Sequence, residues 1–271
     1  MGSRRAFTLI ELLVVIAIVA LLLAILLPVL ADVKKHGKAV ACQSNLSQWG
    51  RVFSMYTMDN DGYFADAAAG QMWTATLKPY YQEAALLRCP GATRPAAPDG
   101  SSYPLGSTFL AWGVFDSTFA MLGLEGLYGS YGMNGYAAKP TPGIQANPWG
   151  YDTRNNWPSP NVTGAAYIPL LLDCAWLGGF PSHEDNPPQH DGQTQGSGPQ
   201  GSNDEIRRYC MDRHRRGING LLLDSAVRKI TLKELWKLKW HQEFDTGGPW
   251  TLAGGVHPHD WPEWMRDMPD Y

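Results

Sequence analysis

The sequence predicts an α+β protein in which one long N-terminal helix packs on a loop-rich, mainly antiparallel β head. Three observations predict this arrangement. An uninterrupted apolar run extends from Leu12 to Leu27, and an apolar seam of helical period follows it. After Gly62, glycine, proline and aromatic residues become more frequent and turn signals recur, which is typical of short strands joined by long loops.

The apolar segment is long enough to cross a bilayer. Residues 7–31 would form a helix of roughly 37 Å at about 1.5 Å per residue. Because every backbone polar group in lipid must bond within the helix, a composition rich in Ile, Val and Leu is compatible with helix here. Basic residues flank both ends of the segment, so the positive-inside rule alone leaves the orientation open: Arg4, Arg5, Lys34, Lys35 and Lys38.

One acidic residue, Glu11, lies inside this segment. An ionised carboxylate in lipid is unfavourable by about 2.5–3.5 kcal/mol on insertion scales. A carboxylate and an ammonium that meet in lipid offset each other's desolvation, and such a pair disfavours any other register. We therefore expect Glu11 to act in assembly.

The residues from Phe7 to Glu11, Phe-Thr-Leu-Ile-Glu, resemble the class III signal of type IV prepilins and type II secretion pseudopilins. Pro28 is the twenty-second residue counted from Phe7, where pilins commonly carry a helix-bending proline. Ala6 stands where these families have Gly. The resemblance implies that a prepilin peptidase cuts between Ala6 and Phe7 and N-methylates Phe7, and that Glu11 pairs with the amino terminus of a neighbouring subunit.

Two other interpretations of this segment remain. One is an ordinary single-pass anchor, and the other is a secretory signal cleaved after Val29-Leu30-Ala31. The length of the apolar block and the presence of Glu11 oppose a secretory signal. The resemblance to prepilins implies a cytoplasmic N-terminus in the inner membrane and a periplasmic head.

Beyond the membrane segment the helix is expected to continue to the turn Asp59-Asn60-Asp61-Gly62. Gly37 and Gly50 weaken it by about 1 kcal/mol each relative to Ala. We divide the chain into a leader (1–6), a transmembrane half-helix (7–31), a periplasmic half-helix (32–60) and a head (61–271). The apolar seam has spacings of three and four residues: Ala39, Cys42, Leu46, Trp49, Phe53 and Tyr56.

In the head, the clearest expected strands are 168–172 and 221–223, each closed by an aspartate, followed by 226–231. Asp224-Ser225 is expected to form a hairpin turn between the last two. The segment 182–204 is polar and rich in Gly, Pro, Gln and Asn, which predicts a flexible, exposed loop.

The head also carries His214, then nine residues, then Asp224 and Ser225. This spacing resembles the prepilin-associated His-x9-Asp-Gly motif, with Ser225 in place of Gly. Shorter blocks along the chain are similar to that family as well: Cys42 to Leu46, Cys89-Pro90, Ser130 to Asn134, Leu235-Trp236 and Trp240-His241.

His214 and Asp224, with Asp173 as a third member, could form a proton relay, because a carboxylate can orient a histidine that carries protons near neutral pH. The sequence has no nucleophile elbow and no HExxH motif. We therefore expect a structural role, in which His214 bonds a backbone group or Asp224, and no enzyme activity.

Metal and cofactor binding is not expected from the sequence. The four cysteines (Cys42, Cys89, Cys174 and Cys210) have no zinc-site spacing, although disulfides are possible outside the cytoplasm. Asp59 and Asp61 are weak calcium candidates, since the twelve-residue EF-hand pattern does not fit. A polar loop collects further candidates by composition alone: His183, Glu184, Asp185, His190 and Asp191.

The net charge of −3 indicates no nucleic-acid partner, since such proteins display a basic face. The short basic run 213–216 is expected to be solvated or paired. Most of the eleven tryptophans are expected to pack the head.

The expected function is a pilin-like or pseudopilin subunit whose partners are a prepilin peptidase, other pilin subunits and the inner membrane. The alternatives are a membrane-tethered module that binds an extracellular polymer such as a polysaccharide, and a secreted hydrolase that uses His214 and Asp224.

Overall fold

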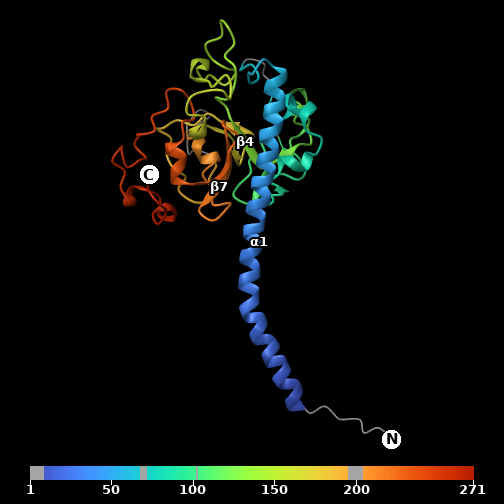
Figure 1. Cartoon of the computed structure of the whole chain (residues 1–271). Helices are drawn as coiled ribbons and strands as arrows, with labels where there is room; N and C mark the ends of the chain where they lie inside the picture. The colour runs from blue at the N-terminus through green and yellow to red at the C-terminus, as the bar shows by residue number, and fades with distance from the viewer. Residues whose placement is uncertain (1–8, 68–71, 102, 195–203) are drawn as a thin grey trace.

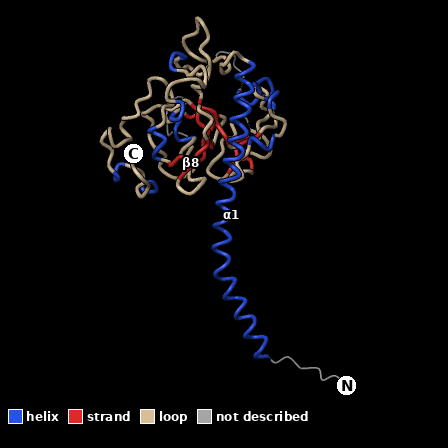
Figure 2. Tube along the Cα trace, in the orientation of Figure 1, coloured by secondary structure: helices blue, strands red, loops and turns tan. Residues whose placement is uncertain are grey.

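The computed structural model describes residues 9–67, 72–101, 103–194 and 204–271. One long helix, α1 (Leu9–Asp59), extends far from a rounded head, and only its second half lies along the head (Figures 1 and 2). The expected long helix is therefore confirmed. Pro28 lies within it and the helix continues through this residue.

The two halves of α1 have opposite surroundings. The first half carries exposed large apolar side chains from Leu9 to Val33, and none of its most apolar window is buried. By length and composition, this is a helix that can cross a membrane. In the second half the predicted apolar seam faces the head, and its central members are buried: Cys42, Leu46, Trp49 and Phe53.

The head contains a five-stranded sheet with the order β6-β4-β5-β7-β8. Three neighbouring pairs in it are antiparallel, and β6 is parallel to β4. Its strands in chain order are β4 (Tyr131–Asn134), β5 (Pro169–Asp173), β6 (Gly178–Gly179), β7 (Gly217–Leu222) and β8 (Val227–Thr231).

A smaller three-stranded sheet has the order β1-β2-β3, with β1 parallel and β3 antiparallel to β2. The mainly antiparallel head predicted by the sequence is thus confirmed. These strands are β1 (Arg94–Pro95), β2 (Leu110–Gly113) and β3 (Tyr128–Gly129), and a short helix, α2 (Trp73–Thr76), precedes them.

The β7–β8 hairpin forms at the predicted turn. Ser225 has a φ of 68°, the left-handed conformation that favours glycine, and Asp224 Oδ1 accepts a hydrogen bond from the Ala226 amide at 2.9 Å. Ser225 therefore takes the conformation that glycine would adopt at this position. β7 starts at Gly217, four residues earlier than expected.

The larger sheet separates two apolar layers. On one side, α1 packs against β5 and β7, where Gly50 allows a close approach: an added Cβ would lie 3.2 Å from a methyl carbon of Leu221. On the other side lies a layer built mainly from the chain after β8, including η7 (Lys233–Lys237). Both layers bury tryptophans, which confirms the packing role predicted for most of them: Trp49, Trp112, Trp236, Trp240 and Trp261.

Trp49 joins α1 to the head. Its side chain is fully buried, its Nε1 donates to the Leu86 carbonyl at 2.9 Å, and its ring meets Trp73 and Tyr81 edge-on. We expect Trp49→Ala to lower the free energy of unfolding by about 3–5 kcal/mol, because it removes a large buried ring and leaves a cavity. Chemical unfolding of the full-length protein in detergent, followed by near-ultraviolet circular dichroism, measures this change.

Met58→Ala is the matched control on the same helix, since Met58 is 81% exposed. It should change stability by less than about 0.5 kcal/mol. An equally small change for Trp49→Ala would contradict the packing of α1 on the head.

Candidate functional site

The processing residues predicted by the sequence, Ala6 and Phe7, lie outside the described residues. Glu11 lies in the first turn of α1, on the exposed apolar half of the helix. Pro28 lies near the other end of this half. The structure thus places a carboxylate and a proline on one long apolar surface that the head does not cover.

Just beyond this surface, an exposed ion pair joins Asp32 of α1 to Arg215 of the head. Arg216 donates through Nη1 to the Asp267 carbonyl at 2.9 Å, and Arg213 is buried in an ion pair. The expectation that the basic run 213–216 is solvated or paired is therefore confirmed.

The predicted pairing of His214 with Asp224 is wrong. The Asp224 side chain stays in the exposed β7–β8 turn, whereas His214 is buried and its Nε2 lies 3.1 Å from Asp173 Oδ2. The topology explains this result, because β7 (Gly217–Leu222) lies between His214 and Asp224 and holds them at opposite ends of one strand. Asp173, at the end of β5, meets the end of β7 that His214 precedes. The hypothesis of a hydrolase that uses His214 with Asp224 loses its geometric basis.

Asp173 is the centre of a buried polar cluster. Its carboxylate is fully buried and accepts hydrogen bonds from Arg213 Nη1 at 3.1 Å and from the Asn219 amide at 2.9 Å. Burial by itself would raise the pKa of Asp173, but His214, Arg213 and the Asn219 amide outweigh it and hold this pKa well below its usual range. Asp173 is therefore an anion inside the fold.

Two cysteines complete the cluster. Cys89 Sγ lies 3.3 Å from His214 Nε2, and Cys42 Sγ of α1 lies 3.6 Å from both oxygens of Asp173. The four ligand atoms of Cys42, Cys89, Asp173 and His214 all lie within 4.8 Å of one another. Among the described residues, this is the group of three or more such side chains that comes close enough to hold a metal ion.

The cluster does not have the geometry of a nucleophilic triad. Cys89 and Asp173 both contact Nε2 of His214, whereas a relay needs the nucleophile and the carboxylate on opposite ring nitrogens. Burial lowers the pKa of His214, but its contacts with Asp173 and Cys89 outweigh this and raise the pKa to about 10. The ring therefore serves poorly as a general base near neutral pH.

The four cysteines are free and buried in the described structure. The metal-binding potential of two of them could not be found from spacing, because the four ligands are spread over residues 42–214. The only sequence signal was the resemblance of short blocks to a prepilin-associated family. Those blocks include Cys42, Cys89 and His214, but the resemblance does not identify them as metal ligands.

The other candidates do not come together. Asp59 accepts a hydrogen bond from the Tyr80 hydroxyl at 3.0 Å, and Asp61 forms the turn after α1 with a φ of 54°. In the loop, His183 packs edge-on against Phe244, and Asp191 accepts from the Thr108 hydroxyl at 2.7 Å.

Most described positions of the loop are exposed or half-buried, as expected, but three residues in it are buried. Within its described part, 182–194, Asp185, Pro187 and Pro188 are buried. Asp185 Oδ2 accepts hydrogen bonds from the amides of Ser182 and Ile206, while its Oδ1 lacks a partner among the described residues. The bond from Ile206 fastens the loop to η6 (Glu205–Arg208), and the bond from Ser182 closes a turn within the loop, so Asp185 is held in the interior. The residues 195–203 of the predicted loop lie outside the described part.

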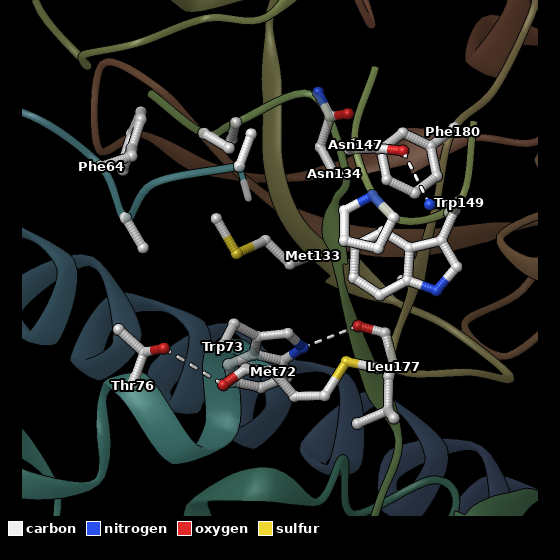
Figure 3. Close-up of a pocket in the computed structure, with 18 of the residues that line it drawn as sticks. Phe64, Met72, Trp73, Thr76, Met133, Asn134, Asn147, Trp149, Leu177 and Phe180 are labelled. Atoms are coloured by element: carbon white, nitrogen blue, oxygen red, sulfur yellow. Dashed lines mark hydrogen bonds between the residues drawn. The ribbon is translucent and has the colours of Figure 1, made fainter. Parts of the chain in front are cut away.

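The head also has an open pocket of about 550 Å³ between α2, the start of β6 and the 147–151 turn. Figure 3 shows Trp73, Met133, Trp149 and Phe180 around it. Several of its polar side chains are occupied by protein groups: Asn134 donates to two carbonyls, and Glu205 pairs with Arg208. The remaining surface is mainly aromatic and aliphatic.

Asp185 gives the fold a testable pH dependence. Burial raises its pKa to about 8, against about 3.9 in an unfolded chain. The folded state therefore holds a proton that the unfolded state loses, so this contribution to stability is complete below pH 4 and disappears as the pH rises to 8. We expect the free energy of unfolding of Asp185→Asn, relative to wild type, to increase by about 1–4 kcal/mol as the pH rises from 5 to 9.

Urea unfolding at a series of pH values measures this difference. Glu184→Gln, at the exposed neighbouring side chain, should leave the wild-type pH profile unchanged. A pH-independent difference between wild type and Asp185→Asn would contradict the buried, protonated carboxyl.

Comparison with known proteins bears on the N-terminal segment. Residues 1–27 match the family model described as the prokaryotic N-terminal methylation motif. No curated protein and no solved structure matches the chain. The chain thus carries a prepilin-type methylation motif that overlaps the apolar half of a long helix, the features of a type IV pilin-like or pseudopilin precursor.

Proposed function

We propose that this protein is a pilin-like or pseudopilin subunit, cleaved after Ala6 by a prepilin peptidase, N-methylated on Phe7 and assembled through α1 into a type IV pilus or a type II secretion pseudopilus. One observation carries the proposal: the methylation motif at residues 1–27 continues into a helix half whose apolar surface the head leaves uncovered. Before assembly, this half lies in the inner membrane with the head in the periplasm.

The mechanism is polymerisation. In the membrane, lipid covers the exposed surface of α1, and in a filament the same surface packs against the helices of neighbouring subunits. Glu11 sets the register. The free-energy cost of its carboxylate in lipid is lowest in the one register where it meets the ammonium group of a processed neighbour. The head, fixed to the second half of α1, faces outward.

The described structure favours neither alternative function. The buried cluster lacks the arrangement of a nucleophilic triad, and the pocket offers a mainly apolar lining in which Asn134, Glu205 and Arg208 already bind protein groups. A hydroxyl-rich polysaccharide needs polar partners at its site, so this pocket is a poor match for it.

The N-terminus of the protein provides the first test. Protein isolated from the membranes of a host with a prepilin peptidase should begin at Phe7 and carry one added methyl group, as measured by intact mass and N-terminal sequencing. The same host without the peptidase should yield the uncut chain. Ala6→Gly serves as a reference for complete cleavage, and a chain that begins at Asp32 would overturn the proposal.

The second test concerns assembly. Glu11→Ala and Glu11→Gln should insert into the membrane as wild type does, since both remove an unfavourable charge from lipid. Both should lower the yield of sheared or cross-linked filaments by at least tenfold, because the register-specific pair with the neighbouring ammonium is lost.

Glu83→Ala, at an exposed acid of the head, is the matched control and should assemble normally. Normal assembly of Glu11→Gln would contradict a role for the charge. Loss of the Glu11 variants from the membrane would show instead that Glu11 acts in membrane insertion.

A further inference from the structure

We propose that Cys42, Cys89, Asp173 and His214 form a structural zinc site that fastens α1 to the head. The four ligands come from four separate segments: the second half of α1, the turn after Leu87, the end of β5 and the chain before β7. All four residues are at most 6% exposed. Two thiolates, an imidazole and a carboxylate form a ligand set typical of zinc.

The distances between the ligand atoms fit a tetrahedral ion. Zinc bonds of about 2.0–2.3 Å place neighbouring ligand atoms roughly 3.3–3.8 Å apart. Three separations in the structure are close to this: 3.1 Å from His214 Nε2 to Asp173 Oδ2, 3.3 Å from Cys89 Sγ to His214 Nε2, and 3.6 Å from Cys42 Sγ to Asp173. Small side-chain adjustments suffice to close the four atoms around one ion.

The groups around the ligands are those that support a metal site. The Gly91 amide donates to Cys89 Sγ at 3.3 Å, and the Tyr131 hydroxyl lies 3.4 Å from Cys42 Sγ. Donors directed at sulfur stabilise thiolates, and bonds to a ligating carboxylate orient it. For Asp173 these bonds come from Arg213 and the Asn219 amide, which leave Oδ2 a lone pair for the ion.

The charges also balance. Two thiolates and one carboxylate contribute −3, while a divalent ion and the buried Arg213 contribute +3. On binding, the two thiol protons and the Nε2 proton of the His214 imidazolium are released to solvent, and the imidazole binds as the neutral base through Nε2. A buried set without net charge avoids the desolvation penalty of an isolated ion.

The site would have a mechanical role. Four protein ligands and deep burial leave no open position for substrate, as in structural zinc sites. Cys42 lies on α1 about one turn beyond Ala39, whose carbonyl accepts a hydrogen bond from the Asn219 side chain. A bound ion would therefore hold the helix to the head near the point where a force along α1 reaches the head.

The decisive experiment measures zinc in the full-length protein, purified in detergent with a thiol reductant, incubated with zinc and desalted. We expect one zinc per chain, and replacement by cobalt should give the intense sulfur-to-cobalt charge-transfer absorption of thiolate ligands. A chelator should lower the thermal unfolding midpoint of wild type. These measurements need no variant.

Variants then assign the ligands. Cys42→Ser, Cys89→Ser and Asp173→Asn should each weaken zinc affinity at least tenfold in a competition with a chromophoric chelator. Cys210→Ser is the matched control, because it removes another buried thiol whose sulfur lies 4.0 Å from Met265 Sδ, away from the cluster. It should still bind one zinc.

Three results would overturn the proposal. One is a wild-type protein that binds no zinc after reduction, and another is equal affinity in Cys42→Ser and wild type. The third is a Cys42–Cys89 disulfide in protein isolated without reductant, together with an unchanged filament yield when zinc is withheld. The N-terminal mass and the filament yield are independent readouts, so failure here leaves the proposed function intact.

Discussion

One buried anion organises the polar groups beneath α1. Asp173 lies at the end of β5, beneath α1, with its carboxylate fully withdrawn from water. An unpaired charge in that position would be strongly unfavourable, so Arg213, His214 and the Asn219 amide must be held where they can reach it. That requirement links β5, β7 and the segment before β7, and it brings Cys42 of α1 and Cys89 to the same place.

The single helix α1 meets two different environments. The head leaves the apolar side chains of the first half of α1 exposed, whereas the second half buries an apolar seam on the head. The seam ends near Thr57, where the turn at Asp61 and Gly62 begins the head. Because both halves belong to one continuous helix, a force or a packing constraint applied to the exposed half is transmitted directly to the cluster beneath the buried half.

Much of this architecture could be predicted from local patterns. The apolar run, the spacing from Cys42 to Tyr56 and the Asp224-Ser225 turn each determine a structure through neighbours within a few residues, and all three appear as expected. The predicted His214–Asp224 pair failed, since the residues between them form the strand β7, which holds the two side chains at its opposite ends. The burial of Asp185 was missed for a related reason: the polar composition of the loop gave no sign of the two backbone amides, of Ser182 and Ile206, that bind its carboxyl group.

Local sequence was enough to predict the membrane-length helix, the methylation motif at residues 1–27 and the class of the head, because each is encoded in contiguous residues. Which ionisable and sulfur-bearing residues meet depends on the packing of distant segments. Each of Cys42, Cys89, Asp173 and His214 lies at least 41 positions from the next, and only the packing of α1 across β5 and β7 brings their ligand atoms within 4.8 Å. Burial makes these contacts important for stability, since polar groups removed from water need hydrogen-bond partners within the protein.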